Sequence, residues 1–251
     1  MSGHSKWATI RRKKSVVDAK RGALFTKLIR EITVAAKVGG EDLNANPRLR
    51  TAVQKAKENN MPNENIDRAI KKGVGGIEGV VYEEVTYEGY GPGGVAIMVQ
   101  CLTDNKKRTA PEMRTIFSKH GGNLGETGCV SYLFSRKGMI IIEAGQASED
   151  EVMELVLDYG VEDVRSEDGN IVVTMPPESF HQVLEIIQKK NYKLIESEIT
   201  YIPKTTVALD EKKAEQCLKL VELLEDQDDV QHVYSNYDIP DDIIAKIGEG
   251  K

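Results

Sequence analysis

The sequence predicts a multidomain α+β protein with an N-terminal helical bundle followed by two α+β domains, one of them ferredoxin-like. Three observations support this fold class. Up to about residue 75, apolar residues recur at steps of three and four, which is the period of amphipathic helices. Beyond residue 79, short apolar runs alternate with Gly- and Pro-rich turns, a pattern typical of strands. Within residues 137–203 the elements follow the order βαββαβ.

The bundle is predicted to begin with a helix over residues 15–38. Its apolar side carries Leu24, Phe25, Leu28, Ile29, Ile32, Ala35 and Ala36. Gly39–Gly40 should end this helix, because glycine adopts the left-handed conformation common at helix C-termini. A second helix is expected from Asn46–Pro47, where asparagine can cap free amides and proline is tolerated. A short third helix before Gly73 completes the bundle.

A hairpin is expected next, with strands over residues 81–87 and 95–101 around a glycine-rich turn. A helix over residues 110–120 and a strand over residues 130–134 should follow. The ferredoxin-like part is then predicted from a strand at 139–143, a capping box of Ser148 and Glu151 that opens a helix, strands at 161–164 and 171–175, a helix from Pro177 and a strand at 192–201.

After Pro203 the sequence predicts one more helix and then one more strand, the strand over residues 230–234. We expect them to return and pair with the strands before residue 134, because an unpaired helix and strand would leave apolar surface exposed. The predicted domains are residues 1–78, a basic helical domain with a mobile arm, residues 79–136 with 204–240, and an inserted ferredoxin-like domain at residues 137–203.

Positive and negative charges are segregated along the chain. Residues 1–75 hold 17 Lys and Arg against 7 Asp and Glu, a net charge of +10, whereas the remaining residues hold 17 against 33, a net charge of −16. A polyanion is attracted to local clusters of Lys and Arg and hardly senses the overall charge of −6. The front of the chain is therefore predicted to contact nucleic acid.

The N-terminal arm concentrates this positive charge, because no acid occurs before Asp18. Such a segment cannot bury enough apolar surface to fold alone. Its single tryptophan could stack on an unpaired base or dock onto its own bundle. For any one amphipathic helix, a solvated lysine face is the alternative interpretation. The predicted nucleic-acid-binding residues are Lys6, Trp7, Arg11, Arg12, Lys13, Lys14, Lys20, Arg21, Lys27 and Arg30.

Membrane and disulfide-rich proteins are not indicated by this sequence. Its apolar stretches are far shorter than the roughly 20 residues that cross a bilayer, and no apolar segment follows the first basic residues as in a secretory signal. Cys101, Cys129 and Cys217 lie far apart without a Cys-x-x-Cys spacing. We therefore expect a cytoplasmic protein with reduced cysteines and no membrane partner.

Catalysis is also not indicated. The four histidines, at positions 4, 120, 181 and 232, lack metal-ligand spacing. The glycine-rich residues 121–128 lack the Gly-Lys-Ser/Thr ending of a phosphate loop and follow a predicted helix, so a turn is the favoured interpretation. The acids of residues 226–229 are interpreted as solvated side chains. We expect no enzymatic activity, no metal site, no other cofactor and no small-molecule substrate.

Several sequence blocks resemble the YebC/PmpR family. They are residues 3–7, 13–14, 21–32, 59–62, 87–94, 103–105, 119–125 and 128–134. The match runs in order to about residue 137 and continues more loosely to Pro240. The resemblance implies three domains in a crescent arrangement and a cytoplasmic transcriptional regulator that binds DNA. Other members, including a mitochondrial translational activator, imply a role at the ribosome in synthesis through proline runs.

The two kinds of nucleic acid would use the same charges differently. Contacts to DNA phosphates gain mainly from counterion release. Base contacts would need side chains such as Asn59, Asn60, Asn63 and Asn65, which are better interpreted as turn and cap residues, so a weak sequence preference is expected. Ribosomal RNA would be recognised by its shape and by stacking. DNA is the favoured partner, and ribosomal RNA is the alternative.

Overall fold

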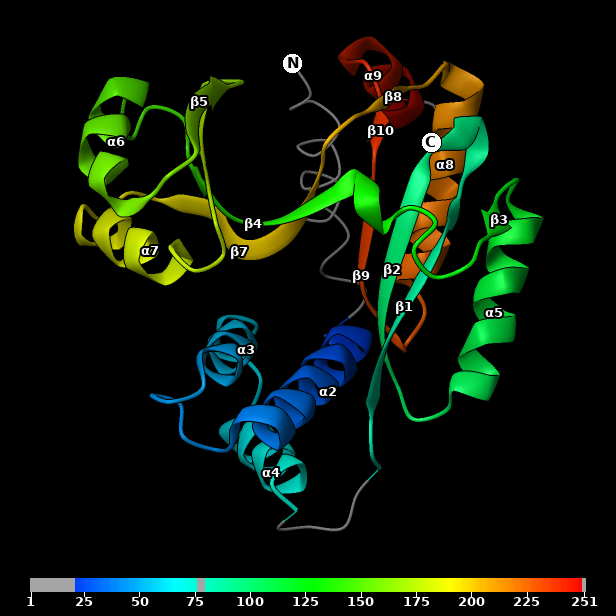
Figure 1. Cartoon of the computed structure of the whole chain (residues 1–251), viewed down its shortest axis with the longest axis horizontal. Coiled ribbons are helices and arrows are strands. Elements are labelled where there is room, and N and C mark those ends of the chain that lie inside the picture. Colours follow the sequence, from blue (N-terminus) through cyan, green and yellow to red (C-terminus); the bar gives the residue numbers. More distant parts are fainter. Residues whose placement is uncertain (1–20, 76–79, 250–251) are drawn as a thin grey trace. The chain divides into compact units, whose positions relative to one another are not determined.

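The computed structural model of the 251-residue chain describes residues 21–75 and 80–249. These residues divide into two compact units, one formed by Tyr132–Thr205 and the other by the residues on either side of it. A helical segment is followed by sheets with packed helices (Figure 1), which confirms the predicted α+β fold class. The boundaries of the three predicted domains and the crescent arrangement stay predictions, and the predicted mobile arm lies outside the described residues.

Three helices form the N-terminal bundle, as predicted. They are α2 (Arg21–Gly39), α3 (Pro47–Glu58) and α4 (Asn63–Gly73). Their buried core is Leu28, Ile32, Ala35, Ala36, Leu49, Ala52, Val53, Ala56, Met61, Ile66 and Ala69. The predicted cap Asn46 is buried, and its side chain accepts from the amide of Leu49 at 3.0 Å while donating to the carbonyls of Ala35 and Gly40 at 2.8 Å. One side chain thus joins the end of α2 to the start of α3.

The larger unit also contains a four-stranded antiparallel sheet with the strand order β3-β1-β2-β9. The strands are β1 (Glu83–Tyr90), β2 (Ala96–Thr103), β3 (Asn123–Leu124) and β9 (Val230–Ser235). The register of β9 on β2 pairs Ile97 with Ser235. This pairing is the return of the C-terminal strand that the sequence led us to expect.

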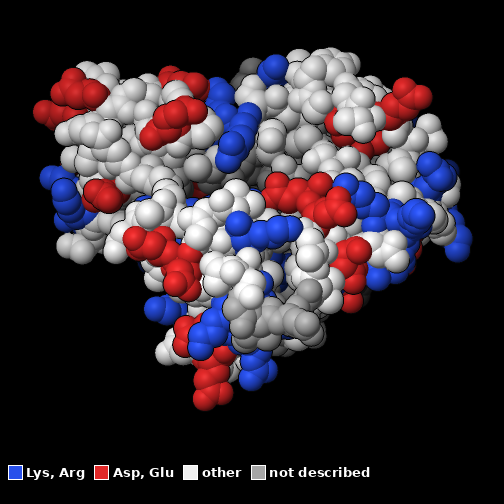
Figure 2. Space-filling model, turned by 60° about the horizontal axis from the view of Figure 1, so that its bottom comes forward, with Lys and Arg blue, Asp and Glu red and all other residues white. Residues whose placement is uncertain are grey.

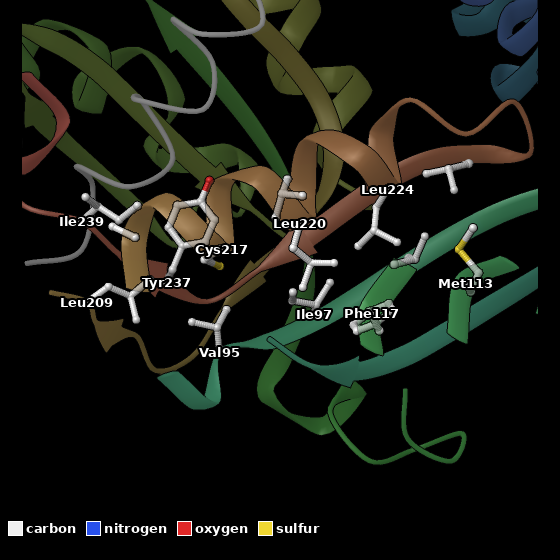
Figure 3. Close-up of a cluster of buried hydrophobic side chains, with 14 of the residues drawn as sticks. Val95, Ile97, Met113, Phe117, Leu209, Cys217, Leu220, Leu224, Tyr237 and Ile239 are labelled. Carbon is white, nitrogen blue, oxygen red and sulfur yellow. The ribbon is translucent and has the colours of Figure 1, made fainter. Parts of the chain in front are cut away.

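Two helices pack against this sheet and complete its core. They are α5 (Lys106–Lys119) and α8 (Glu211–Glu225). Figure 3 shows Leu220 of α8 and Phe117 of α5 close to Ile97 of β2, and all three are fully buried. The 3₁₀ turn η2 (Pro92–Gly94) connects β1 to β2. Four short elements were not expected from the sequence: β3, which lies in the predicted turn, β8 (Val207–Ala208), β10 (Tyr237–Asp238) and α9 (Asp241–Glu249).

The smaller unit has the predicted ferredoxin-like topology. Its elements are β4 (Phe134–Ile142), α6 (Glu149–Val156), η4 (Leu157–Tyr159), β5 (Asp163–Glu167), β6 (Asn170–Met175), α7 (Phe180–Lys189) and β7 (Leu194–Pro203). The strand order is β5-β6-β4-β7, antiparallel throughout. The capping box of Ser148 and Glu151 is present. Asp168 and Gly169, with φ of 50° and 80°, make the two-residue turn between β5 and β6.

Several boundaries differ from the sequence prediction, and three of the differences have a clear physical cause. The strand expected over residues 130–134 is wrong: residues Ser131–Leu133 form a 3₁₀ turn, η3, and β4 starts only at Phe134. The amides of Val130 and Ser131 donate to the Glu88 carboxylate, each at 2.8 Å, so they do not join a strand ladder. Helix α5 starts at Lys106, earlier than expected, because Asn105 caps it. Helix α7 starts at Phe180, after a turn at Pro177.

The packing of α8 predicts a large difference between two Leu→Ala substitutions. Leu220 is fully buried, so Leu220→Ala should lower the free energy of unfolding by about 2–5 kcal/mol. Leu157 is 67% exposed, and Leu157→Ala should change it by less than about 0.5 kcal/mol. Urea denaturation followed by circular dichroism measures both values. Equal losses in the two variants would contradict the described core.

Candidate nucleic-acid interface

The sequence-predicted binding residues fall into three groups in the structure. Lys6, Trp7, Arg11, Arg12, Lys13, Lys14 and Lys20 lie outside the described residues. Arg21 opens α2, and only its backbone is described. Lys27 and Arg30 lie on α2, where their side chains turn toward the C-terminal end of α8 and the loop that follows it. The structure therefore describes the contacts of only these last two.

Arg30 is held inside the protein by several acceptors. Its Nη1 donates to Asp229 Oδ1 at 2.7 Å and to the carbonyl of Asp228, and the Leu102 carbonyl lies at 3.4 Å. The guanidinium carbon also lies 5.4 Å from the centre of the Tyr82 ring, within the range of a cation–π interaction. Only 12% of the Arg30 side chain is exposed. The charge that the sequence assigned to a polyanion is already balanced here.

Lys27 makes a similar contact one turn earlier on α2. Its Nζ donates to the carbonyl of Glu225, the last residue of α8, at 2.5 Å. The last carbonyls of a helix have no partner within the helix and carry its negative dipole end. A lysine at this position satisfies one of them and complements the dipole. The role of Lys27 and Arg30 as nucleic-acid contacts stays a prediction that the observed contacts do not favour.

Asp229 is the acceptor that organises this region. Its carboxylate receives the hydroxyls of Thr103 at 3.0 Å and Thr109 at 2.7 Å, in addition to Arg30 Nη1. Arg108 Nη2 lies 3.0 Å from the same carboxylate. Helix α2, strand β2, helix α5 and the loop before β9 therefore meet at one side chain. The interpretation of residues 226–229 as solvated acids is wrong for Asp229, whose carboxylate is engaged within the protein. The sequence did not indicate this, because the partners of Asp229 lie far away along the chain.

The ionisation of Asp229 follows from these partners. Burial would by itself raise the pKa of the carboxyl, but the hydrogen bonds from Thr109, Arg108 and Thr103 outweigh it, and the nearby positive charge of Arg30 acts in the same direction. The net effect is a pKa below the ordinary aspartate value. Asp229 is therefore charged in the folded protein at neutral pH.

A second group of cations on the bundle faces solvent. These side chains lie on α3 and α4, away from the buried core of the bundle: Arg50, Lys55, Lys57, Arg68, Lys71 and Lys72. Several are in the last turns of their helices, Lys55 and Lys57 in α3 and Lys71 and Lys72 in α4, where cations complement the helix dipole. None of the six is among the binding residues predicted from the sequence, although the helical period gives their outward position.

The asparagines considered for base contacts serve local structure instead. Asn59 is the C-terminal cap of α3, and its side-chain amide donates to the Lys55 carbonyl at 2.7 Å. Asn60 has a φ of 58° and so lies in the left-handed region that asparagine tolerates. Asn63 begins α4. The turn interpretation is confirmed for Asn59 and Asn60.

The glycine-rich loop after α5 is closed by a carboxylate of the protein itself. Glu88 is 4% exposed and accepts from the amides of Gly128 at 2.9 Å, Val130 at 2.8 Å and Ser131 at 2.8 Å. Burial would raise the pKa of Glu88, but these three amides hold it below the ordinary value. The amides of Gly128, Val130 and Ser131, at the end of this loop and just after it, are thus already engaged within the protein.

The remaining reactive side chains have structural surroundings. Cys101 and Cys217 are buried, and burial raises the pKa of each thiol to about 12. His120 Nδ1 lies 2.9 Å from the Ile116 carbonyl at the end of α5, as expected for a helix-end histidine. Among the described residues, no group of three or more His, Cys, Asp or Glu side chains is placed to hold a metal ion.

Two family models cover most of the chain. One, described as the TACO1/YebC protein N-terminal domain, matches residues 5–76, and the other, described as the TACO1/YebC second and third domain, matches residues 82–237. The chain belongs to the TACO1/YebC family. Membership is in line with the resemblance read from the sequence blocks, and the N-terminal TACO1/YebC domain coincides with the basic part of the chain.

Relatives within the TACO1/YebC family match over nearly the full length. A protein from Syntrophus aciditrophicus is 56% identical over 98% of this chain and 99% of its own length, and one from Dictyoglomus turgidum is 55% identical over 98% and 100%. Both are named probable transcriptional regulatory proteins. The crystal structure of a conserved hypothetical protein from Aquifex aeolicus is 51% identical, with a TM-score of 0.80 over 90% of this chain and 93% of that chain.

No helix within residues 21–75 and 80–249 combines the length and the apolar character that crossing a bilayer requires.

The contacts of Asp229 predict a specific, pH-dependent loss of stability. Asp229→Asn removes the charge that faces Arg30 and Arg108, and we expect a loss of about 3 kcal/mol in the free energy of unfolding at pH 7 because a buried cation is left uncompensated. The pKa of Asp229 is lower in the folded state than in the unfolded state. The extra stability of the wild type over the variant is therefore fully present above the unfolded-state pKa of about 3.9, and it is lost as the pH falls through the folded-state pKa. Urea denaturation from pH 7 to pH 3 measures the difference.

Asp228→Asn is the matched control for this prediction. Asp228 is exposed, and its backbone carbonyl, not its carboxylate, accepts from Arg30. The control should stay within about 0.5 kcal/mol of the wild type. A loss that is equal for the two variants, or that persists unchanged in acid, would show that the Asp229 carboxylate does not hold these elements together.

Proposed function

We propose that this chain is a non-enzymatic cytoplasmic regulatory protein that binds nucleic acid, in the first place DNA, through its basic N-terminal part. The names of its relatives, probable transcriptional regulatory proteins, support a regulatory role. The observation that carries the proposal is the surplus of positive charge in residues 1–75, 17 cations against 7 acids, with the cations of α3 and α4 facing solvent. No cofactor takes part in this proposal.

The proposed contacts are made to phosphates. On the bundle they come from Arg21 and the exposed cations of α3 and α4, and on the arm they come from Lys6, Arg11, Arg12, Lys13, Lys14 and Lys20. Each contact releases condensed counterions from the polymer. Because phosphate contacts position a protein without reading base sequence, and because Asn59 and Asn60 serve the turn after α3, the expected binding has a weak sequence preference.

Lys27 and Arg30 have a different part in the proposal. Their charges are used within the protein, against the end of α8 and Asp229. We therefore assign them to holding α2 in place and leave them out of the proposed phosphate contacts. The acidic remainder of the chain, with a net charge of −16, repels a polyanion and thereby directs it to the N-terminal part.

Ribosomal RNA is the second candidate target, and it would make the protein a ribosome-associated translation factor. The observation that favours it is Trp7, which stands within the basic arm next to Lys6. Structured RNA offers unpaired bases on which an aromatic side chain can stack, whereas a regular DNA duplex does not. The phosphate contacts would be the same for both targets.

Removal of the arm charges tests the proposed binding directly. The variant Arg11→Gln, Arg12→Gln, Lys13→Gln and Lys14→Gln should bind a duplex DNA more weakly, because each substitution removes one cation that can neutralise a phosphate. The slope of log K against log salt should fall in magnitude by up to about 3.6, or about 0.9 for each phosphate that is no longer neutralised. Fluorescence anisotropy titrations at several salt concentrations measure both quantities.

A second variant with the same change in charge is the control. It replaces Lys189, Lys190, Lys212 and Lys246, exposed lysines of the acidic part, by glutamine. This variant should keep the wild-type slope. If both variants behave alike, the effect comes from net charge alone and the arm is not the contact.

The nature of the target is tested by crosslinking in cells and sequencing of the attached nucleic acid. If DNA is the main target, promoter fragments should be enriched with the wild-type protein and depleted with the arm variant, because the arm supplies phosphate contacts. Enrichment of ribosomal RNA without promoter DNA would reject transcriptional control as the main task. Enrichment of neither would reject the proposed function as a whole.

A further inference from the structure

Helix α5 is a basic element within the acidic part of the chain. Its 14 residues carry five cations, Lys106, Lys107, Arg108, Arg114 and Lys119, and one acid, Glu112. Beyond residue 75, acids outnumber Lys and Arg by 33 to 17. Figure 2 shows Lys and Arg side chains gathered on the side of the molecule where α5 lies in Figure 1. A local cluster of this sign attracts anions regardless of the acidic average.

The cations of α5 point away from its packed side. Thr109, Met113 and Phe117 are buried against the sheet and α8, and all five cations are exposed. Lys107 and Arg114 are seven residues apart, so they lie on one face about 10 Å apart along the helix axis. Their outward position follows from the same helical period that buries Met113.

The start of α5 carries charge of the sign that the helix dipole disfavours. Its first turn contains three consecutive cations, Lys106 to Arg108, and no acid. The positive end of a helix dipole is stabilised by acids and destabilised by cations. Ion pairs within the protein account for Lys106 and Arg108 in this turn, so Lys107 is the first-turn cation for which the helix offers no reason.

Two of these five cations are balanced within the protein. Lys106 pairs with Glu83 at 2.5 Å, and Arg108 pairs with Asp104 and Asp229 at 2.8 and 3.0 Å. Within residues 21–75 and 80–249, no ion pair engages the other three, Lys107, Arg114 and Lys119. The charges of Lys107 and Arg114 have no role in the described fold, whereas Lys119 lies in the last turn of α5, where a cation complements the helix dipole.

The chemistry of this face favours a phosphate polymer over a folded protein partner. Between the cations, the exposed residues of α5 are Pro111, Thr115 and Ser118. The hot spots of protein–protein interfaces are enriched in Trp and Tyr as well as Arg, and α5 exposes no aromatic side chain and no large apolar one. Lys107 and Arg114 share one side of the exposed surface and Lys119 lies about 120° further round the helix, and cations with small polar neighbours suit contacts to phosphates.

We propose that the outer face of α5, through Lys107, Arg114 and Lys119, is a second phosphate-contacting surface used together with the basic N-terminal part. This inference rests on the proposed function and extends it to the acidic part of the chain. Two contact surfaces on one polymer raise the overall affinity by making the second contact intramolecular. The α5 surface supplies affinity and orientation without reading base sequence.

The test compares the full-length wild type with the variant Lys107→Gln, Arg114→Gln and Lys119→Gln. The slope of log K against log salt should fall in magnitude by up to about 2.7 with a duplex DNA and by up to about 2.1 with a single-stranded RNA. The matched control, Lys189→Gln, Lys212→Gln and Lys246→Gln, changes the net charge equally and should keep both wild-type slopes. Circular dichroism shows whether each variant is folded. If the triple variant is unfolded, the single variant Arg114→Gln takes its place, and its slope on duplex DNA should fall in magnitude by about 0.9.

The outcomes separate the two proposals. If the wild type binds both probes and the α5 variant keeps the slopes of the control, the α5 surface is not a phosphate contact, and the proposed function of the N-terminal part stands. If the wild type binds neither probe in a salt-dependent way, the proposed function fails and the α5 proposal fails with it. A fall in slope with only one of the two probes supports the α5 surface and identifies which polymer it contacts.

Discussion

Asp229 is a buried carboxylate that joins three elements of the larger unit to the loop before β9. It receives Arg30 from α2, Thr103 from β2, and Thr109 and Arg108 from α5. A charged group in the interior is tolerated only when hydrogen-bond donors fill its lone pairs. Here the donors come from elements that are far apart in the sequence. Because the buried carboxylate needs these donors, the helical bundle, the sheet and α5 are held in one arrangement around it.

The positive charge of the N-terminal part has two uses that only the structure separates. On α2, Lys27 and Arg30 neutralise the end of α8 and Asp229. On α3, Arg48 pairs with Glu31 and Glu84, whereas the other cations of α3 and α4 face solvent. Glu88 shows the corresponding use of an acid, since its carboxylate accepts hydrogen bonds from three backbone amides at the end of the glycine-rich loop. Charged side chains in this chain thus hold the fold together at some positions and face solvent at others.

Much of the fold could be predicted because it depends on local signals. The period of the bundle helices, the cap at Asn46, the capping box at Ser148 and the Asp168–Gly169 turn each act within a few residues. The strand expected over residues 130–134 was wrong because Glu88, some 40 residues away, takes the amides of Val130 and Ser131. The burial of Arg30 escaped prediction for the same reason, since its partner Asp229 is 199 residues away. A basic face on a helix looks the same in a sequence whether it meets a polymer or a buried acid.

Ile97 pairs with Ser235, and the whole of the Tyr132–Thr205 unit lies between these two residues in the sequence. This order has a consequence for folding during synthesis of the chain. During synthesis, β2 leaves the ribosome before α8 and β9 exist, and at typical elongation rates it waits on the order of ten seconds for them. In that interval the ferredoxin-like unit already has all its strands, while β2 exposes an open edge and an uncovered apolar face. The sheet of the larger unit is thus the last part to close, and the nascent chain is most vulnerable to sticking to its neighbours at β2.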